Sequence, residues 1–138
     1  MILVWAALEV YELKNIYYPA IFHPEEAGFS VSVPDLEGCF TQGETMDEAM
    51  EMVQDAIGLM LEGLTEYPKA SLPSDLSVAG NDFVVMVPFD WTAYNRAHNS
   101  RAVKKTLSLP AWLNEAAEAA HINFSKILQE ALEAKLNV

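Results

Sequence analysis

Short runs of alternating apolar and polar residues mark the first half of the chain. Residues 16–22 read as a strand, residues 29–33 alternate apolar and polar as a half-buried strand does, and residues 38–43 can supply a short third strand. Pro19 indicates an edge position for the first strand, because proline cannot donate a hydrogen bond to a neighbouring strand. Residues 83–87 are all apolar, which predicts a buried fourth strand. The pattern therefore predicts an antiparallel sheet.

One long amphipathic helix is predicted between the third and fourth strands. Thr45 and Glu48 have the spacing of a capping box, in which each side chain accepts a hydrogen bond from the other end of the first turn. The apolar positions that follow recur at helical spacing: Met46, Ala49, Met50, Val53, Ile57, Met60, Leu61 and Leu64. We expect the helix to run to Glu66 and to end before Pro68.

The end of the chain has a different pattern. Residues 103–109 alternate like a short strand, and Pro110 follows, a residue that suits the first turn of a helix. Apolar residues then recur at helical spacing up to residue 120. The pair His121 and Ile122 interrupts them, and Asn123 is a favourable N-cap for a second helix. A strand and two helices are predicted here.

Residues 91–101 lose all periodicity and are polar, which predicts a linker. We therefore divide the chain into a domain over residues 1–90, the linker, and a domain over residues 102–138. The second domain is too small to bury a core of its own. We expect it to form a homodimer in which the two strands pair as a ribbon, and a higher oligomer is left open.

Charge is distributed unequally between these parts. The whole chain has a net charge of −12. Residues 1–90 carry 16 acidic and two basic side chains, a net charge of −14, whereas residues 91–138 carry four acidic and six basic ones, a net charge of +2. An acidic front and a mildly basic end favour two domains with different partners.

The predicted C-terminal strand carries candidate DNA contacts. Lys104, Thr106 and Ser108 share its outward face, and a two-stranded ribbon fits the major groove of DNA. A solvated strand face explains the same residue types equally well. The start of the second helix has free amides and the positive end of a helix dipole, which can hold a phosphate. The candidate phosphate contacts are Asn123, Phe124, Ser125 and Lys126, with Lys105 and Arg101 beside the strand.

The sequence gives little support for a catalytic site or a metal site. The predicted strand interiors contain no Asp or Glu, so the carboxylates that a two-metal nuclease needs are missing. His23, His98 and His121 show no partner pattern, and Cys39 is expected to be a small buried residue. We expect no enzyme activity, no cofactor and no metal. The apolar run at residues 1–8 is too short to span a membrane and lacks the features of a secretion signal, so a soluble cytoplasmic protein is expected.

Two segments resemble known families. Residues 104–110 and 122–132 resemble a ribbon-helix-helix repressor domain, in which Lys104, Thr106 and Ser108 match the base-contacting positions. Asn123, Phe124 and Ser125 match its phosphate clamp. Residues 18–22 and 28–49, above all the stretch from Pro34 to Ala49, resemble the HicB antitoxin family. Residues 1–15 lie outside this resemblance.

The resemblance implies a fold and a function. The fold class is α+β, with a partial ribonuclease-H-like domain, in which an antiparallel sheet packs on one long helix, followed by a ribbon-helix-helix domain. The implied function is an antitoxin that masks a small basic RNA-cleaving toxin, HicA, and represses its own operon by binding operator DNA. We expect the toxin to contact an acidic surface that includes Asp35, Glu37, Phe40 and Gln42.

Two alternatives stay open from the sequence. The chain could be a stand-alone repressor whose first domain senses a small ligand. It could also be a small metal-dependent nuclease using Asp35, Glu37 or His23, which the lack of strand carboxylates disfavours.

Overall fold

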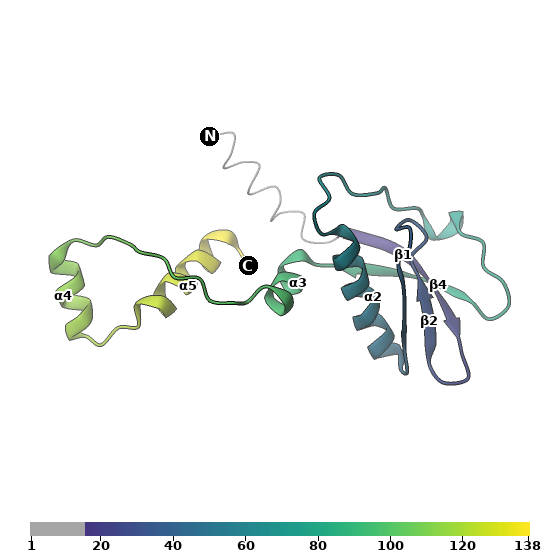
Figure 1. The fold of residues 1–138 in the computed structure, drawn as a ribbon, viewed down its shortest axis with the longest axis horizontal. Helices are drawn as coiled ribbons and strands as arrows, with labels where there is room; N and C mark the ends of the chain where they lie inside the picture. Colours follow the sequence, from purple (N-terminus) through teal and green to yellow (C-terminus); the bar gives the residue numbers. More distant parts are fainter. Residues whose placement is uncertain (1–15) are drawn as a thin grey trace.

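A computed structural model describes residues 16–138, so the part of the first predicted domain before Ile16 lies outside the described residues. The fold is α+β (Figure 1). In chain order the elements are β1 (Ile16–Pro24), β2 (Phe29–Ser32), β3 (Phe40–Gly43), α2 (Met46–Leu61), the 3-10 helix η1 (Pro73–Asp75), β4 (Phe83–Phe89), α3 (Trp91–His98), α4 (Ala111–Ala119) and α5 (Phe124–Leu136). The four strands and the long helix predicted for the first half are confirmed. The expectation that the fourth strand is buried is wrong, because β4 lies at an edge of the sheet and only Val87 and Phe89 in it are buried.

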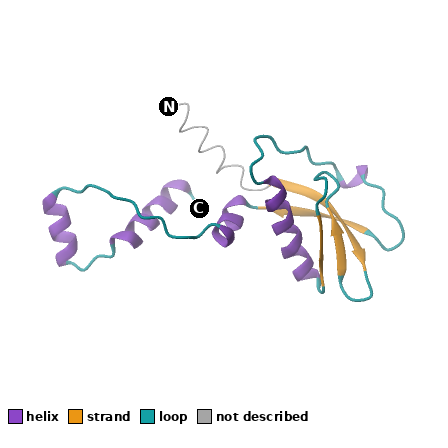
Figure 2. Cartoon of the chain, in the orientation of Figure 1, coloured by secondary structure: helices purple, strands orange, loops and turns teal. Residues whose placement is uncertain are grey.

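The four strands form one antiparallel sheet in the order β3-β2-β1-β4. Helix α2 packs across one face of this sheet (Figure 2). The core lies between them: Tyr18, Ala20 and Phe22 of β1 face the helix, whose contribution is Ala49, Val53, Ile57 and Leu61. Because alternate strand residues point to opposite faces, the odd-numbered residues of β1 lie on the other side.

The start of α2 follows the predicted capping pattern. The Thr45 hydroxyl accepts a hydrogen bond from the Glu48 backbone N–H at 3.1 Å. The Glu48 carboxylate accepts one from the backbone N–H of Glu44, one residue before the cap, at 2.9 Å. One unbonded amide of the first helical turn, that of Glu48, and the amide of Glu44 just before the cap are thereby satisfied.

The predicted end of α2 at Glu66 is wrong, because the helix ends at Leu61. Gly63 adopts a left-handed conformation with φ +76°, which glycine accepts without steric cost and which stops a helix. The N–H of Leu64 then bonds the carbonyl of Leu61 at 3.1 Å, and the Leu64 side chain is exposed. Leu64 continues the helical spacing of the apolar residues, so the sequence pattern extended the predicted helix past Gly63, where it ends.

The edge position predicted from Pro19 is also wrong, because β1 lies between β2 and β4. The physical reason is that β2 is short. It pairs only with residues 21–24 of β1, so Pro19 lies where β4 is the only described strand beside it. A residue without an N–H is therefore tolerated in an interior strand.

Part of the predicted linker is a helix. Residues 91–98 form α3, and the Asp90 carboxylate caps it by accepting from the N–H groups of Thr92 and Ala93. Tyr94 is buried against Gly58 of α2. A helix of eight residues with one buried side chain is too short to show apolar periodicity. The first packing unit therefore extends beyond residue 90.

The C-terminal helices begin where the sequence predicted. Pro110 precedes α4, and the Asn123 side chain caps α5 by accepting from the Lys126 N–H at 3.1 Å. His121, with φ +56°, separates the two helices. Residues 103–109 form no strand within the single chain (Figure 2). No described residue after Tyr94 is buried.

Candidate partner-binding surfaces

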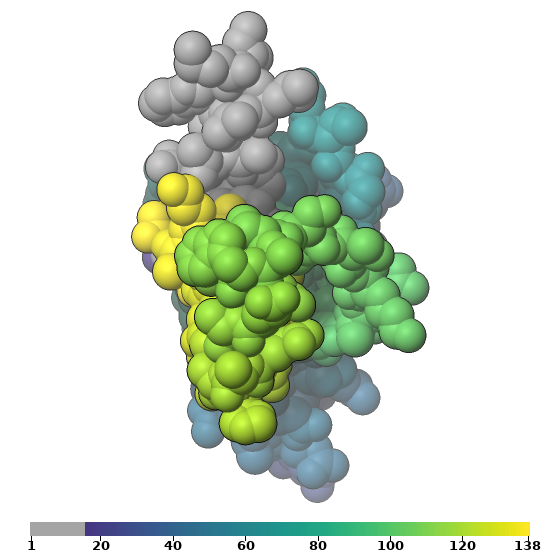
Figure 3. Space-filling model, turned by 90° about the vertical axis from the view of Figure 1, so that its left-hand side faces the viewer, coloured from purple at the N-terminus to yellow at the C-terminus, as the bar shows by residue number. Residues whose placement is uncertain are grey.

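The C-terminal part exposes an apolar surface that a single chain leaves uncovered. Its large exposed side chains are Val103, Leu107, Leu109, Trp112, Leu113, Ile122, Phe124, Ile127 and Leu132. Segment 105–109 and helices α4 and α5 enclose an open groove of about 620 Å³, lined by Leu107, Leu113 and Ile127 among others. Figure 3 views this end of the molecule, with α4 nearest the viewer. Apolar surface of this extent is typical of an interface.

The side chains predicted to read DNA bases are all exposed. Lys104, Thr106 and Ser108 alternate with Leu107 and Leu109, and the two leucines line the apolar groove. In an extended segment, alternate residues point to opposite sides. The structure thus brings the leucines together on the groove and leaves the three polar residues in solvent.

The predicted phosphate contacts gather at the start of α5. The Asn123 side chain is occupied by the Lys126 amide, while Phe124 and Ser125 supply the first two amides of the helix. The Lys126 ammonium lies 3.9 Å from Glu130 on the same helix, an exposed pair that contributes little to stability. Arg101 and Lys105 are exposed in the segment before α4.

The four residues predicted to contact a toxin fall into two groups. Phe40 and Gln42 lie on one face of the edge strand β3, opposite Ser32 and Ser30 of β2, and Phe40 is 74% exposed. Asp35 is half-buried, and its carboxylate accepts hydrogen bonds from both the N–H and the hydroxyl of Ser71, at 2.9 and 2.6 Å. Asp35 thus holds the loop after α2 in place. Glu37 is exposed in the same turn as Asp35.

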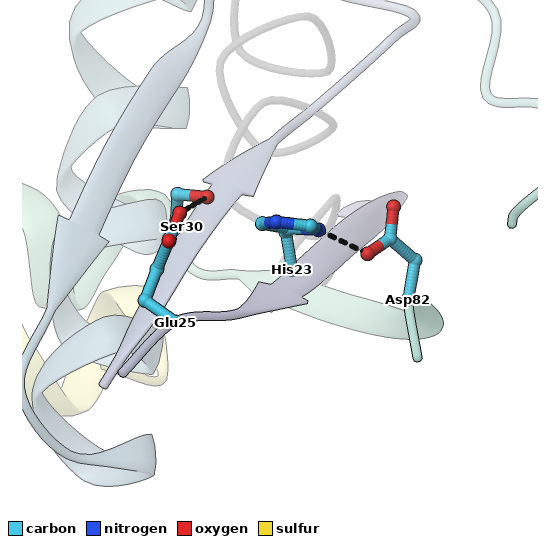
Figure 4. Close-up of polar contacts among 4 residues, drawn as sticks. All are labelled: His23, Glu25, Ser30 and Asp82. Atoms are coloured by element: carbon cyan, nitrogen blue, oxygen red, sulfur yellow. Dashed lines mark hydrogen bonds and ion pairs between the residues drawn. The ribbon is translucent and has the colours of Figure 1, made fainter. Parts of the chain in front are cut away.

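Acidic side chains line a shallow groove beside Gln42. Glu25, Glu44 and Glu48 contribute to this groove, which has a volume of about 410 Å³. Glu25 also accepts a hydrogen bond from the Ser30 hydroxyl at 2.9 Å (Figure 4). An acidic, open surface of this kind attracts basic partners and speeds their encounter.

His23 has a partner that the sequence did not indicate. Its Nδ1 is hydrogen-bonded to the Asp82 carboxylate, which comes from the residue before β4 (Figure 4). This contact raises the pKa of His23 above its ordinary value. The two residues are 59 positions apart and meet because β1 and β4 are neighbours, so no local pattern could reveal the pair.

Aromatic side chains attach α3 to the sheet and to α2. The Tyr94 ring packs against Phe89 and Trp91, and its hydroxyl donates to Glu62 at 2.8 Å. Burial, with the Glu62 carboxylate adding, raises the pKa of Tyr94 to about 12. The His98 ring stacks on Tyr94 with ring centres 4.2 Å apart. Sequence reasoning missed this cluster because its members come from three elements.

Comparison with known proteins identifies the family of this chain. A profile described as the HicB-like antitoxin of bacterial toxin–antitoxin systems matches residues 18–132, most of the chain. The chain belongs to the HicB-like antitoxin family. It is 40% identical over 74 residues to antitoxin HicB 1 of Photorhabdus laumondii, covering 52% of this chain and 46% of that protein. It is 43% identical over 44 residues to antitoxin HicB 2 of the same organism, covering 32% of each. The chain thus spans about half or less of the length of these curated relatives.

The fold agrees with this family. The structure is similar to a chain of a toxin–antitoxin complex from Streptococcus pneumoniae, with a TM-score of 0.52 and 27% sequence identity. The match covers 88% of this chain and 99% of that one. The mixed α+β architecture of this chain is thus shared with a chain of a toxin–antitoxin complex.

HicB-like antitoxins are regulators without enzymatic activity, which agrees with the expectation that this chain is not an enzyme. Within residues 16–138, no three His, Cys, Asp or Glu side chains converge as a metal site. Cys39 is buried, as predicted, and burial raises the pKa of its thiol. Among the helices described, none combines the length and the apolar character that crossing a bilayer requires.

Proposed function

We propose that this chain is a cytoplasmic antitoxin with two binding activities. Its first domain binds and masks a small basic RNA-cleaving toxin of the HicA type. Its C-terminal domain forms a homodimer that binds operator DNA and represses its own operon. The observation that carries the proposal is the match of one antitoxin profile to residues 18–132, because it includes both the sheet and the two C-terminal helices.

The toxin-binding half of the proposal is supported by charge and exposure. Residues 1–90 have a net charge of −14, and Glu25, Glu44 and Glu48 line an open groove beside β3. Phe40 projects from the same edge strand and is 74% exposed. A large exposed aromatic ring beside carboxylates is a typical anchor for a partner with basic side chains. We do not propose Asp35 as a direct toxin contact, because its carboxylate already accepts two hydrogen bonds from Ser71.

The toxin is masked without chemistry from this chain. Covering the toxin's RNA-binding surface is sufficient, so the partial ribonuclease-H-like domain that we propose, which in the described residues runs from β1 to α3, needs no catalytic carboxylates. The sheet order β3-β2-β1-β4 with α2 on one face supports this assignment.

The DNA-binding half is supported by the uncovered apolar groove. In the proposed ribbon-helix-helix dimer, Leu107 and Leu109 turn inward, and the segments over residues 103–109 of two copies pair as a ribbon. Lys104, Thr106 and Ser108 then face the major groove. The start of α5 holds a phosphate through the amides of Phe124 and Ser125. Lys126, with Lys105 and Arg101, adds positive charge for the DNA backbone.

The two activities are separable by mutation. The double variant Lys104→Ala, Thr106→Ala is expected to lose operator binding in a mobility-shift assay yet still rescue growth when co-expressed with the toxin. The double variant Phe40→Ala, Glu44→Gln is expected to keep operator binding and to lose the rescue of growth. Circular dichroism checks that each variant is folded. Loss of both activities in one folded variant would overturn the division of labour.

Co-expression with a small basic protein encoded beside this gene tests the antitoxin role itself. A stable complex and relief of toxicity are expected. Operator binding without complex formation would instead leave a stand-alone repressor.

A further inference from the structure

Strand β3 forms an edge of the sheet, and its outer side is open. It pairs with β2 through residues 40–43, and no strand among the described residues lies beyond it. The side chains of Phe40 and Gln42 are exposed. An edge strand with unpaired backbone groups is a template for pairing with another strand.

A hydrogen bond just before β3 shows which of its backbone groups point outward. The Val33 N–H donates to the Cys39 carbonyl at 3.0 Å, so these two residues form a hydrogen-bonded pair that continues the β2·β3 ladder. Opposite residues alternate between bonded and non-bonded pairs along an antiparallel ladder. Phe40 and Gln42 therefore belong to non-bonded pairs, and their N–H and C=O groups point away from β2.

Hydrogen bonds close off both ends of this open stretch. Before it, the Cys39 N–H donates to the Leu36 carbonyl at 3.0 Å. After it, the Glu44 N–H donates to the Glu48 carboxylate at 2.9 Å. Among the described residues, none supplies a hydrogen bond to the outward backbone groups between these ends. Two N–H and two C=O groups are thus left open in the spacing of a ladder.

We propose that a short extended segment of the basic toxin adds to this edge as an antiparallel strand, an inference that rests on the antitoxin role proposed above. A segment of three residues is sufficient. Its first residue forms a hydrogen-bonded pair with Gln42 and its third residue forms one with Phe40, so all four outward groups of β3 are satisfied. Addition of a strand to a sheet edge is a recurring mode of peptide recognition.

Charge favours a basic residue at the first position of the segment. Glu25, Glu44 and Glu48 line the groove of about 410 Å³ to which Gln42 also contributes. Directly opposite residues of paired strands project their side chains from the same face of a sheet. A Lys or Arg opposite Gln42 therefore brings its charge to the carboxylate groove, where the opposite charges attract.

The third position of the segment favours an apolar residue. The Phe40 ring lies on the same sheet face as the Gln42 side chain, and its cross-strand neighbour on β2 is the small Ser32. An apolar side chain opposite Phe40 covers part of this exposed ring, and such cross-strand pairs stabilise a sheet. The proposed segment therefore has, in chain order, a basic residue, any residue and an apolar residue.

A second copy of this chain fits the edge less well. If two β3 strands paired about a two-fold axis, Phe40 of each copy would face Gln42 of the other. Glu44 would then lie opposite Gly38, which follows Glu37. Carboxylates of the two copies would approach each other at both ends of the pairing and repel.

Residue-resolved amide exchange of the full chain, followed by NMR, tests the added strand. The probe is the small basic protein encoded beside this gene. Without it, we expect fast exchange at Phe40 and Gln42 and slow exchange at Thr41 and Gly43, whose amides bond to β2. In the complex, exchange at Phe40 and Gln42 should slow by about tenfold or more, while Thr41 and Gly43 stay protected.

Thr41 can identify the new neighbour. Across an antiparallel pair, residues of a non-bonded pair have the closest Cα atoms, and Thr41 forms such a pair with the middle residue of the added segment. We expect an NOE from the Thr41 Hα to an Hα of isotope-labelled toxin. The assigned toxin residue should have a basic residue before it and an apolar residue after it.

The variant Gln42→Pro removes one outward N–H and leaves the hydrogen bonds between β3 and β2 in place. It should weaken toxin binding by about tenfold or more in calorimetric titration. Gln42→Ala, which loses the side chain but keeps the N–H, is the matched control and should bind nearly as tightly as the wild type. Circular dichroism checks that each variant is folded.

Three results would overturn this inference and leave the antitoxin role intact. The first is a stable complex in which Phe40 and Gln42 still exchange fast. The second is slow exchange at both residues in the protein alone, which would mean that another strand already occupies the edge. The third is unchanged binding by folded Gln42→Pro, or equal weakening by Gln42→Pro and Gln42→Ala.

Failure of the antitoxin role has a different signature. If the wild-type chain forms no complex with the small basic protein, the proposed function is overturned and the added strand with it. If Gln42→Pro fails to fold, amide exchange in the wild-type complex still decides.

Discussion

Gly58 offers a test of how α3 is held against α2. A Cβ atom built on Gly58 would lie 2.3 Å from the Tyr94 ring, far inside van der Waals contact. Tyr94 is 8% exposed, and its hydroxyl bonds Glu62. The Gly58→Ala substitution must therefore push the ring, and α3 with it, away from the helix.

The expected magnitude follows from two opposing effects. Overpacking a filled site costs about 1–3 kcal/mol. Replacing glycine by alanine inside a helix stabilises it by about 0.5–1 kcal/mol. The steric effect is larger, so Gly58→Ala should lower the free energy of unfolding by about 1–2 kcal/mol.

The sign should reverse when the ring is removed. In a Tyr94→Ala background only the helix effect is left, so Gly58→Ala should stabilise the protein by about 0.5–1 kcal/mol. The coupling energy between the two sites is then ~2 kcal/mol. Urea unfolding of the four proteins, followed by far-ultraviolet circular dichroism at one fixed protein concentration, measures it.

Either of two results would refute this reasoning. One is stabilisation by Gly58→Ala in the wild-type background, which would mean that the ring moves aside at no cost. The other is an equal effect in both backgrounds, which would mean that Tyr94 is not the group that the new methyl meets.

Three further predictions concern other contacts. Asp35→Ala should lower the free energy of unfolding by about 1–3 kcal/mol in urea titration, because two donors of Ser71 lose their acceptor, while Glu37→Ala in the same turn should have almost no effect. Thr45→Ala should cost about 1 kcal/mol in the same assay, and Thr45→Ser, which keeps the capping oxygen, should cost much less; equal losses would remove the cap as the cause. The His23 imidazole should titrate above 6.5 by NMR and move down toward that value in Asp82→Asn. Because its pKa is raised in the folded state, the pair favours folding below about pH 6.5 and this contribution fades as the pH rises through the folded-state pKa; an unchanged midpoint in Asp82→Asn would show that Asp82 is not the cause.

In the C-terminal part, the single chain forms the predicted helices but not the predicted strand. The sequence predicted two helices with a polar N-cap between them, and α4 and α5 begin at the expected residues. The strand predicted over residues 103–109 does not form in one chain. A strand needs a hydrogen-bonded neighbour, and among residues 16–138 of the single chain no strand lies beside this segment. The two-stranded ribbon remains a prediction, because it requires residues 103–109 of a second copy as the neighbouring strand.

Local signals in the sequence determined which elements exist and where most begin. Alternation located β2, mostly apolar runs of strand length located β1 and β4, and the spacing of Thr45 and Glu48 located the start of α2. Capping and strand patterns depend on residues a few positions apart, so a short stretch of sequence is enough to show them. The stretch from Pro34 to Ala49 carried the family resemblance, which the profile match to residues 18–132 confirms.

Only the tertiary structure decided which distant residues meet. It placed β1 inside the sheet in spite of Pro19, paired His23 with Asp82, engaged Asp35 with Ser71 and folded residues 91–98 onto Gly58. Each of these contacts joins residues that are 33 or more positions apart or depends on how far a neighbouring strand extends. Their geometry is set by packing of the whole sheet and helix, and short-range patterns carry no information about it.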